Sequence, residues 1–350
     1  MTCGPSAERP SVSVIIPHLN QRARLEACLD SIRRTTYPHF SVCVVDNGAE
    51  ASDIGDIGLA RPDVHVLRLP CNKGYAGGCN AGLRHTSSKY VLFLNDDTLV
   101  EPGWLDALVE TAEHDGTVGA LQPKILSLRA YRRGTRRFDH AGAAGGLIDR
   151  LGFPYCYGRV FSGTEVDRGQ YDRHSAIFWA SGTAMFAVRE VVEKLGGFDE
   201  DFFMHMEEID LCWRMQLQGY RICSVPEAVV YHEGGASLSE GSVRKIFFNH
   251  RNNVAMMLKN CGLTTLLLVL PARMLLEVAA ACFYLFSAES GVAKAFSVIR
   301  AAGDNLLRLG STMRKRRQVQ QSRTVSDRDL FRSSPLFILS VRKGGPPQLT

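Results

Sequence analysis

Two stretches decide the fold: Ser11–Pro17, which reads SVSVIIP, and Tyr90–Asp97, which reads YVLFLNDD. Each is an apolar or β-branched run that stops at a proline or at polar residues, as expected of a buried strand. Ser41–Val45 and Val64–Leu69 have the same character, and Ala23–Arg34 carries apolar residues at helical spacing. Strands that alternate with helices predict βαβ units, an α/β class and a parallel sheet buried on both faces.

The rest of the chain extends this pattern less regularly. It predicts helices over Gly78–His85, Glu101–His114 and about Glu207–Gln218, with strand character returning over Ile177–Val188. The stretch Leu126–Gln170 is rich in Gly, Arg and Tyr without clear periodicity, which favours loops and short strands near a substrate. In parallel sheets ligands bind beyond the carboxyl ends of the strands, so polar residues that follow strands are candidates for the site.

The composition is that of a globular protein. Of 350 residues, 45% are hydrophobic and 22% are charged, which excludes wholesale disorder and collagen-like repetition. The net charge of +5 is uneven, because Asn305–Thr350 holds ten Lys and Arg against two Asp and Glu, which leaves about −3 for the first 304 residues. The basic character therefore belongs to a C-terminal tail, and nucleic acid is not an expected partner.

The ten cysteines form no CxxC pair, and most lie inside apolar runs such as Val42–Val44. This pattern is typical of buried reduced cysteines and not of a disulfide framework or a zinc site. No basic stretch followed by an apolar run precedes Pro10, so we expect no signal peptide. These observations predict a cytoplasmic protein.

The most hydrophobic stretch is Leu263–Phe286, LTTLLLVLPARMLLEVAAACFYLF. It is long enough to span a bilayer, but Pro271, Arg273 and Glu277 fall near its middle. Each central charge costs roughly 2.5–3.5 kcal/mol in a spanning helix. A helix lying in the membrane interface fits better, with Arg314–Arg317 (RKRR) downstream to contact anionic headgroups. The alternative is a buried helix pair that completes the core. We expect a peripheral protein on the inner face of the cell membrane.

Polar residues follow two of the expected strands. Asp46 comes directly after the second strand, and the triplet Asn95, Asp96 and Asp97 comes after the fourth. Adjacent carboxylates at a sheet edge repel each other unless a cation or a hydrogen-bond donor is present, which suggests a divalent metal site. The alternative is a polar turn in which an Asp caps the next segment.

A second candidate is the acid-rich segment Gly196–Arg214, GGFDEDFFMHMEEIDLCWR, where carboxylates stand among large apolar side chains. On a helix Glu207 and Asp210 share a face, whereas Glu208 is rotated away from them. A carboxylate beside large apolar groups can be tuned to act as a base. The alternative is a charged helix N-terminus that the helix dipole stabilises.

Two further segments are candidates. His232 lies in Tyr231–Gly235 (YHEGG) after an apolar run, from where it could reach a metal held by Asp97, although such a histidine is commonly a core residue. Asn72–Gly82 (NKGYAGGCNAG) carries four glycines ahead of a helix. These glycines would let backbone amides approach a phosphate or ribose, or would only let the helix pack on the sheet.

Taken in order, these segments resemble the family 2 glycosyltransferases with the GT-A fold, and within them the bacterial rhamnosyltransferase-like branch that builds cell-surface polysaccharide. The resemblance runs from Ser11 to about Asn260. The segments that carry it are VSVIIPHLN (12–20), VVDNG (44–48), NKGYAGGCNAG (72–82), FLNDDT (93–98), ASGTAMF (180–186), GGFDEDFFMHMEEIDLCWR (196–214) and VVYHEGG (229–235). The ordered set is specific, whereas no single member is.

The resemblance implies a Rossmann-like nucleotide-binding half with a mixed, mostly parallel sheet, joined to an acceptor-binding half and followed by a C-terminal helical extension. Together with the hydrophobic stretch and the basic C-terminal end, it predicts an N-terminal tail (1–10), a GT-A domain (11–260), an apolar, membrane-associating helical region (261–304) and a basic tail (305–350). It also implies transfer of a sugar from a nucleoside diphosphate with inversion at the anomeric carbon, dependent on Mn²⁺ or Mg²⁺.

Carried over to this sequence, the resemblance places Asp97 at the metal-binding last position of the family's DxD element and makes His232 a metal or diphosphate ligand. Glu208 takes the position of the catalytic base, where the family usually has Asp, and Asp210 is the nearby competitor. Asn95 replaces the first acid of DxD. The expected donor-binding residues are Pro17, Asn20, Asp46 (for the base), Asn72, Gly74, Asn80, Asn95 and Asp96. The expected sugar or acceptor loop contains Ser181, Gly182, Glu207 and Asp210.

The donor expected from the resemblance is dTDP-rhamnose, the acceptor is a polyprenyl-diphosphate-linked glycan or a polysaccharide, and an anionic membrane surface is a further partner. The oligomeric state stays open, a homo-oligomer included. Arg251 would face the acceptor diphosphate or form a structural salt bridge. Three alternatives remain: a UDP- or GDP-sugar transferase, a nucleotidyltransferase, and a non-catalytic scaffold of a polysaccharide-assembly complex. Asp97, Glu208 and His232 argue against the scaffold, and residues 17–20 (PHLN) replace the Gly-rich loop typical of nucleotidyltransferases.

Overall fold

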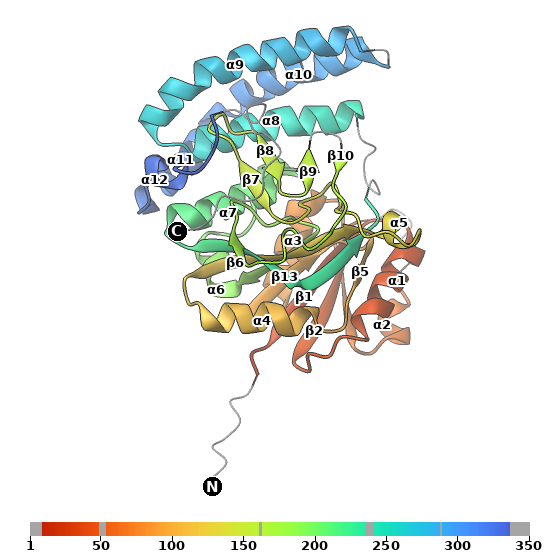
Figure 1. Ribbon diagram of the computed structural model, residues 1–350. Coiled ribbons are helices and arrows are strands. Elements are labelled where there is room, and N and C mark those ends of the chain that lie inside the picture. Colours follow the sequence, from red (N-terminus) through yellow and green to blue (C-terminus); the bar gives the residue numbers. More distant parts are fainter. Residues whose placement is uncertain (1–8, 49–53, 161–162, 235–240, 288, 337–350) are drawn as a thin grey trace.

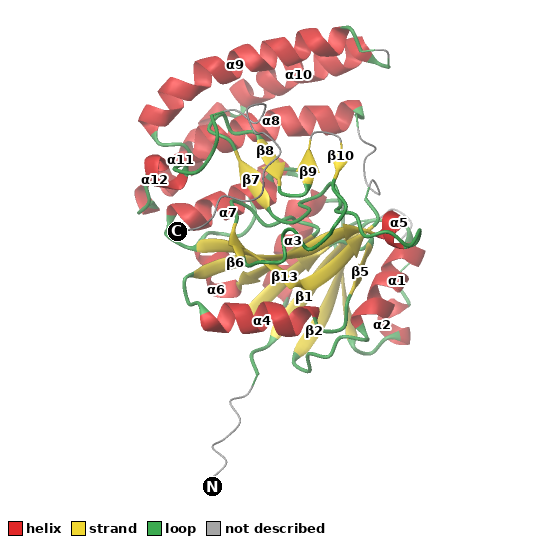
Figure 2. Cartoon of the chain, in the orientation of Figure 1, coloured by secondary structure: helices red, strands yellow, loops and turns green. Residues whose placement is uncertain are grey.

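The computed structural model describes residues 9–48, 54–160, 163–234, 241–287 and 289–336. A nine-stranded sheet runs through this part of the chain, with helices on both of its faces (Figures 1 and 2). The strands are β1 (Val12–His18), β2 (Phe40–Asp46), β3 (Val64–Arg68), β4 (Tyr90–Leu94), β5 (Thr98–Val100), β6 (Val118–Ser127), β7 (Gly146–Ile148), β8 (Pro154–Cys156), β9 (Arg159–Val160), β10 (Gly163–Thr164), β11 (Ser175–Ala176), β12 (Ala184–Val188) and β13 (Arg221–His232). The helices are α1 (Arg22–Ile32), α2 (Ile57–Ala60), α3 (Gly74–His85), α4 (Trp104–His114), α5 (Leu128–Tyr131), α6 (Arg189–Lys194), the 3₁₀ turn η1 (Glu200–Phe202), α7 (Glu207–Leu217), α8 (Val243–Asn260), α9 (Leu263–Leu285), α10 (Gly291–Leu307), α11 (Leu309–Ser322) and α12 (Asp327–Leu330).

The order of strands across the sheet is β11-β13-β6-β12-β4-β1-β2-β3, with β5 paired to β13. The four strands β3, β2, β1 and β4 pair in parallel, as the sequence predicts, and β6 pairs in parallel with β13. Strand β12 lies antiparallel between β4 and β6, which makes the sheet mixed. The α/β class and the mixed sheet are therefore confirmed.

Both faces of the sheet are buried. In β1, Val14 and Ile16 belong to the core under α1 and α4, whereas Ile15 belongs to the core under α3 and α7. Gly82 lets α3 approach the sheet closely, because a Cβ there would lie 2.4 Å from Cγ2 of Ile15. Burial on two faces explains why the strand sequences are continuous apolar runs and do not alternate with polar residues.

Two predicted elements have different bounds in the structure. Helix α3 begins at Gly74 instead of Gly78, because Oδ1 of Asn72 accepts a hydrogen bond from the N–H of Gly74 at 2.8 Å and starts the first turn there. Within Ile177–Val188 the strand β12 covers only Ala184–Val188. The residues before it form a loop that reaches the candidate site.

Helices α8 to α12 form the C-terminal part of the molecule. Helices α9 and α10 lie side by side on the outside, and α8 packs beneath them (Figure 1). Within the segment expected as a basic tail from residue 305, the described residues up to 336 pack on the rest of the fold, because α11 packs on α8 and Phe331 is buried against Phe178. Residues 337–350 lie outside the described residues.

The cysteines agree with the prediction of reduced thiols. The nine cysteines in the described part of the chain are all free, and among them only Cys71 and Cys282 are exposed. The stability of the described fold therefore rests on packing and hydrogen bonding without covalent cross-links between these cysteines.

Candidate active site

Three parallel strands end side by side at one edge of the sheet. The register pairs His18, the last residue of β1, with Asp46, the last residue of β2, and Asn95 follows β4 on the other side of β1. Asp46 is buried, with its Oδ2 accepting a hydrogen bond from Nε of Arg68 at 2.9 Å. Its Oδ1 is buried with no hydrogen-bond partner among the described residues. An acceptor in this state suits an N–H group of a ligand.

His18 belongs to this edge although it was not predicted. Its Nδ1 lies 2.6 Å from Oδ2 of Asp96, and its side chain is 1% exposed. Burial raises the pKa of Asp96, and the hydrogen bond with His18 limits that rise. The residues predicted beside it are Pro17, which is half-buried, and Asn20, which is exposed. The signal for His18 was its position directly at the end of the first strand.

Strand β13 brings His232 to the same edge. Its register pairs His232 with Thr98, the residue after Asp97. Nε2 of the buried imidazole lies 3.2 Å from Oδ1 of Asp97, and Nδ1 lies 2.8 Å from Oδ1 of Asp139. We call Asp97, His232 and Asp139 the histidine cluster. Asp139 was not predicted, because it lies in a stretch of sequence without periodicity.

The charges of the histidine cluster compensate one another. Burial disfavours the imidazolium form of His232, but its hydrogen bonds with Asp139 and Asp97 outweigh burial and raise its pKa to about 10. Burial likewise opposes ionisation of Asp97, but the hydrogen bond and the charge of His232 lower its pKa below the usual range. His232 is therefore a positively charged group held between two carboxylates.

The histidine cluster fits a divalent cation in part. No group of three or more His, Cys, Asp or Glu side chains in the described ranges is arranged to hold a metal ion. Asp97 and His232 offer two ligand atoms 3.2 Å apart, close to the about 3 Å between neighbouring ligands of an octahedral ion. Asp139 orients the ring, as carboxylates commonly do for metal-bound histidines. These two residues suit a cation whose other ligands come from phosphate oxygens or water.

The glycine-rich segment Asn72–Gly82 is hydrogen-bonded to the residue that follows β2. The side chain of Asn47 donates from Nδ2 to the carbonyl oxygen of Gly74 at 2.8 Å and accepts at Oδ1 from the N–H of Lys73 at 3.0 Å. Gly74 has a φ of +71°, and a Cβ there would lie 2.2 Å from the carbonyl oxygen of Phe203. The segment that holds Asn72 and Gly74 thus lies between the end of β2 and the turn before α7.

The prediction that Asn80 binds the donor is corrected by its contacts. Its side chain is buried in α3, where Nδ2 donates to the carbonyl oxygen of Phe198 at 2.9 Å and to Oε1 of Glu200 at 3.0 Å. Its Oδ1 accepts from the N–H of Phe198 at 2.9 Å. Because the side-chain amide ties α3 both to the loop before η1 and to Glu200 within η1, Asn80 has a structural role.

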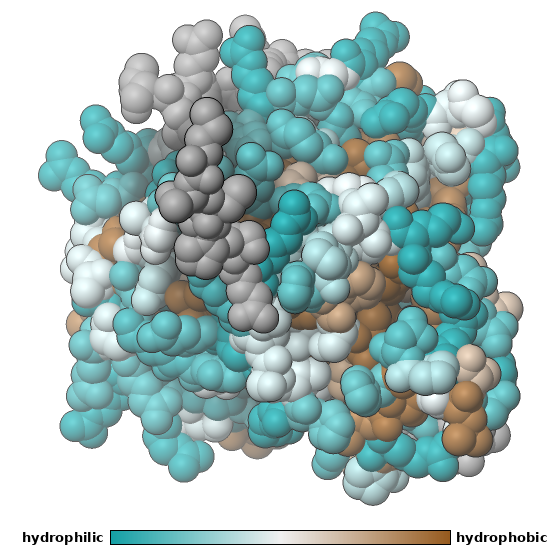
Figure 3. Space-filling view, turned by 90° about the horizontal axis from the view of Figure 1, so that it is seen from below, coloured by the Kyte–Doolittle hydropathy of each residue, from teal (hydrophilic) through white to brown (hydrophobic). Residues whose placement is uncertain are grey.

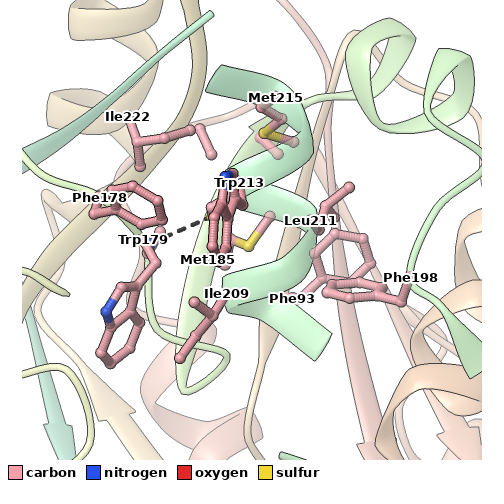
Figure 4. Packing of buried hydrophobic residues seen from close by; sticks show 14 of the residues in the cluster. Phe93, Phe178, Trp179, Met185, Phe198, Ile209, Leu211, Trp213, Met215 and Ile222 are labelled. Carbon is pink, nitrogen blue, oxygen red and sulfur yellow. Dashed lines mark hydrogen bonds between the residues drawn. The ribbon is translucent and has the colours of Figure 1, made fainter. Parts of the chain in front are cut away.

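Helix α7 is held rigidly by its apolar side chains. Figure 4 shows Ile209, Leu211 and Trp213 of this helix packed among buried residues of the neighbouring strands and loops. The rings of Trp213 and Phe178 meet edge to face, with centroids 5.5 Å apart. The carboxylates at the start of α7 therefore stand on a fixed element.

Glu207 and Glu208 are the first two residues of α7. Burial raises the pKa of Glu208 to about 7, and hydrogen bonds from backbone N–H groups, including that of Gly182, limit the rise. Burial, and then the charge of Glu208, raise the pKa of Glu207 well above its usual range. Oε2 of each is buried with no hydrogen-bond partner among the described residues. At neutral pH Glu208 is therefore present in both forms, as a general base requires, whereas burial favours the neutral form of Glu207.

The turn before α7 is strained. Three of its non-glycine residues have positive φ: Phe203 (64°), His205 (67°) and Met206 (72°). Each such residue costs of order 1–3 kcal/mol. Asn252 of α8 holds the turn, because its Nδ2 lies 3.0 Å from the carbonyl oxygen of Phe202, 2.8 Å from that of Met204 and 2.7 Å from that of His205. The position of Glu208 therefore depends on α8, which sequence reasoning did not foresee.

Asp210 does not fit the predicted acceptor loop or the role of competing base. It is fully buried, and Arg214 donates from Nε to its Oδ2 at 2.8 Å. Nζ of Lys259 lies 2.9 Å from the same carboxylate, and Nδ2 of Asn260 donates to its Oδ1 at 2.9 Å. Asp210 is the centre of an ion-pair network that joins α7 to α8.

One loop connects Glu208 to the histidine cluster. The N–H of Gly182 faces the carboxylate of Glu208, and the hydroxyl of Ser181 donates to the carbonyl oxygen of Ala141 at 3.0 Å. Ala141 belongs to the same segment as Asp139, and its N–H donates to Oδ1 of Asp139 at 2.9 Å. The predicted Ser181 and Gly182 thus lie between the candidate base and the candidate metal ligands.

Arg251 has a structural role, which is one of the two roles expected from the sequence. Its guanidinium donates to the carbonyl oxygens of Asp201 at 2.7 Å and Phe202 at 2.9 Å, and lies 3.4 Å from Oδ2 of Asp304. It is buried and supports η1 from α8.

Comparison with known proteins agrees with this geometry. Residues 13–188 match the family model described as glycosyl transferase family 2. The match covers half of the chain and includes Asp46 and Asp97. The chain belongs to glycosyltransferase family 2. His232 and Glu208 lie beyond the matched residues.

Three curated relatives illustrate the family. The O-antigen biosynthesis protein RfbC of Myxococcus xanthus is 31% identical over 242 residues, 66% of this chain and 18% of that protein. The pre-mycofactocin glycosyltransferase of Mycobacterium tuberculosis is 29% identical over 253 residues, 70% of this chain and 47% of that protein. The N-acetylglucosaminyl-diphospho-decaprenol L-rhamnosyltransferase of the same organism is 26% identical over 239 residues, 65% of this chain and 78% of that protein. The chain spans less than half the length of the first two relatives.

Solved structures confirm the GT-A-like fold. The crystal structure of GalNAc-T7 with UDP, GalNAc and Mn²⁺ matches with a TM-score of 0.56 at 15% identity, over 71% of this chain and 47% of that chain. At this identity the likeness concerns the fold alone.

Proposed function

We propose that this family 2 glycosyltransferase moves a sugar from a nucleoside diphosphate to a hydroxyl group with inversion, and that Glu208 is the base. The observation that carries the proposal is the state of the Glu208 carboxylate. Burial raises its pKa to about 7, and its Oε2 is buried without a partner among the described residues. A carboxylate in this state can accept a proton at neutral pH.

The proposed reaction is a single displacement. The acceptor oxygen attacks the anomeric carbon from the face opposite the diphosphate, and its proton passes to the carboxylate of Glu208. The bond between the anomeric carbon and the diphosphate oxygen breaks, and its electron pair leaves with the nucleoside diphosphate. One base suffices, since no covalent intermediate forms on the protein. Burial favours the neutral form of Glu207 beside it, which limits the negative charge next to the incoming hydroxyl.

Two residues of the histidine cluster would hold a divalent cation. Asp97 would supply Oδ1, and His232 would supply Nε2 after the cation displaces the proton from that nitrogen. Asp139 would keep the ring oriented through its contact with Nδ1. When bound, the cation neutralises charge on the departing diphosphate. An imidazole ligand favours Mn²⁺ over Mg²⁺.

The donor that we propose first is dTDP-rhamnose, with UDP- and GDP-sugars as the alternatives. The name of one relative, an L-rhamnosyltransferase, supports the sugar. The buried free Oδ1 of Asp46 supports a base with an N–H donor, which thymine, uracil and guanine all have.

The proposed acceptor is a polyprenyl-diphosphate-linked glycan or a polysaccharide of the cell surface. The names of two relatives support this class, since one includes diphospho-decaprenol and the other O-antigen biosynthesis. We propose that the protein works on the cytoplasmic side of the membrane, where free cysteines such as the nine described here stay reduced.

The test incubates the purified full chain and Mn²⁺ with dTDP-rhamnose, a UDP-sugar or a GDP-sugar, and with N-acetylglucosamine linked to a polyprenyl diphosphate. We expect a rhamnosylated product from dTDP-rhamnose, with release of dTDP. EDTA should stop the reaction and Mn²⁺ should restore it. The product should have the anomeric configuration opposite to that of the donor, as measured by NMR.

Each other outcome rejects a defined part of the proposal. Transfer from a UDP- or GDP-sugar alone rejects rhamnose and keeps the transferase. Full activity in EDTA rejects the cation. Absence of transfer and of nucleoside diphosphate release with all three donors rejects the transferase and favours the scaffold.

A further inference from the structure

The outer surface of α9 is apolar along its whole length. Its large exposed side chains extend from the first turn to the last and are between 51% and 75% exposed: Leu263, Leu267, Leu268, Leu275, Val278, Phe283 and Leu285. The helix is long and apolar enough to cross a membrane, yet only 11% of its most apolar stretch is buried. The predicted alternative of a buried helix pair therefore does not hold.

The two charged residues of α9, Arg273 and Glu277, face the protein instead of solvent. Arg273 is 2% exposed, and its Nε donates to Oε1 of Glu277 at 2.9 Å. Its guanidinium lies over the ring of Phe153 at 3.8 Å, and Nδ1 of His250 lies 2.5 Å from Oε2 of Glu277. A helix on the surface of a water-soluble protein has the opposite polarity. In the sequence, Arg273 and Glu277 argue against a lipid environment for this helix. In the structure both side chains point toward the protein and away from the exposed surface of α9.

Helix α10 widens this surface. It packs along α9, and its exposed large residues are Val292, Phe296, Ile299, Leu306 and Leu307. We call the exposed apolar side chains of the two helices the α9–α10 face. Scattered apolar residues are normal on a protein surface, but a continuous face of this kind marks an interaction site. Figure 3 shows the molecule from below, away from these helices, and hydrophilic residues cover most of that view.

Exposed arginines lie on α10 and on the helix that follows it, α11. Arg300 of α10 is exposed, as are Arg314 and Arg317 of α11, and Arg317 lines a surface hollow together with Leu263 at the start of α9. The exposed acid in the described part of residues 263–322 is Glu289. A second copy of the chain, packed face to face, would bring these cations near one another, whereas anionic headgroups would neutralise them.

The segment Arg314–Arg317 (RKRR) offers fewer free basic side chains to a membrane than the sequence predicts. Nζ of Lys315 lies 2.5 Å from Oδ2 of Asp201, and Arg316 donates to the carbonyl oxygens of Leu258 at 2.7 Å and Cys261 at 2.6 Å. Two of the four basic residues therefore stabilise the fold. The other two, Arg314 and Arg317, remain exposed toward solvent.

We propose that the α9–α10 face docks on the surface of an anionic bilayer, with α9 lying in the plane of the interface. The apolar side chains enter the boundary between headgroups and acyl chains, and the exposed arginines contact the headgroups. A spanning α9 would lose the contacts of Arg273 and Glu277 with the rest of the protein. The proposal does not depend on the sugar or the reaction, because binding is measured without turnover.

The first test is flotation of the full chain with preformed vesicles of phosphatidylcholine, with or without phosphatidylglycerol. The wild type should float, and more strongly with phosphatidylglycerol. The double variant Leu268→Glu/Leu275→Glu should lose at least about tenfold in partitioning, since each substitution removes apolar burial. Leu59→Glu is the matched control, because Leu59 is 86% exposed on α2, and it should float like the wild type. Wild-type protein that stays unbound, or a double variant that binds equally, overturns the proposal.

The second test uses the two exposed cysteines in the described chain. An environment-sensitive fluorophore on Cys282 of α9, in a Cys3→Ser/Cys71→Ser variant, should shift to the blue when vesicles are added. The same fluorophore on Cys71, in a Cys3→Ser/Cys282→Ser variant, should not shift. If both sites shift equally, or neither does, docking through this face is wrong. A wild-type dimer that Leu268→Glu converts to a monomer, without vesicle binding by either, would assign the face to a second copy.

Discussion

At the scale of single residues, Glu208 and Asp210 differ in what surrounds their carboxylates. Oε2 of Glu208 has no partner among the described residues, and burial raises its pKa to about 7. Asp210 instead receives hydrogen bonds from Arg214, Lys259 and Asn260. The carboxylate of Asp210 is thus engaged by two buried cations and has a structural role, whereas that of Glu208 keeps a free acceptor oxygen.

The first prediction concerns the base. Glu208→Gln keeps the size of the side chain and removes the proton acceptor, so kcat should fall by about 10²–10⁴-fold with little change in donor KM. Glu190→Gln on the exposed part of α6 is the matched control and should keep full activity. Asp210→Asn should instead lower the melting temperature. Loss of turnover in a folded Asp210→Asn variant, with normal turnover in Glu208→Gln, would contradict the assignment.

The second prediction is the pH dependence of the rate. The base acts as a carboxylate, and its pKa is about 7, so kcat should rise with pH through this value. At pH 6 the rate should be about tenfold below its plateau, because only about a tenth of Glu208 is then ionised. Steady-state kinetics between acidic and mildly alkaline pH measures this. A rate that is flat across that interval rules out Glu208 as the titrating base.

The third prediction concerns Asp139, which orients His232 through Nδ1. Asp139→Asn should weaken Mn²⁺ binding by about 10–100-fold, because the imidazole loses the group that fixes its direction. Binding is read directly as free Mn²⁺ by electron paramagnetic resonance, independently of turnover. Asp63→Asn, at an exposed position, is the control. Unchanged Mn²⁺ affinity in Asp139→Asn would show that Asp139 does not contribute to cation binding.

At the scale of elements, α8 decides the geometry of the turn that delivers Glu208. Three residues of this turn have positive φ without being glycine, and the amide of Asn252 bonds its carbonyl groups. Arg251 adds two hydrogen bonds to the neighbouring η1. A strained turn persists only where surrounding contacts determine it, and here those contacts come from one helix.

The fourth prediction compares two adjacent asparagines of α8. Asn252→Ala should cost about 1–3 kcal/mol of stability and also lower kcat, because the turn can then relax and move Glu208. Asn253→Ala loses a single hydrogen bond to the carbonyl oxygen of Gly152, so it should cost stability but keep kcat. Urea unfolding and steady-state kinetics measure the two effects. Equal kcat in both variants would mean that Asn252 has only a structural role.

At the scale of the whole molecule, the C-terminal segment completes the core of the catalytic part. Phe331, which follows α12, is 6% exposed. Its ring stacks on Phe178 at 5.8 Å and meets Trp213 edge to face at 5.5 Å. Residues more than a hundred positions apart thus share the packing that holds α7.

The fifth prediction tests this packing. Phe331→Ala should lower the free energy of unfolding by about 3–5 kcal/mol, because it removes a buried ring and leaves a cavity beside Trp213. Leu336→Ala, at a position that is 67% exposed, should change it by less than about 0.5 kcal/mol. Urea denaturation measures both. A Phe331→Ala protein as stable as the wild type would show that the segment after α11 is dispensable for the fold.

The sequence by itself determined the features that depend on residues close together in the chain. Apolar runs predicted β1 and β4, and the polar residues that follow them predicted Asp97 at the sheet edge. The order of short motifs indicated the family and pointed to Glu208 and His232. Such features are readable because strands and helices impose a period on the chain and because parallel strands end together.

Only the tertiary structure decided which distant groups meet. It paired His18 with Asp96 and Asp139 with His232, and it placed Asp210 in an ion-pair network instead of the site. It also turned Arg273 and Glu277 of α9 inward. The physical reason is the same in each case. Burial and charge compensation arise between elements that are far apart in the chain, and the periodicity of one segment does not indicate which other element will cover it.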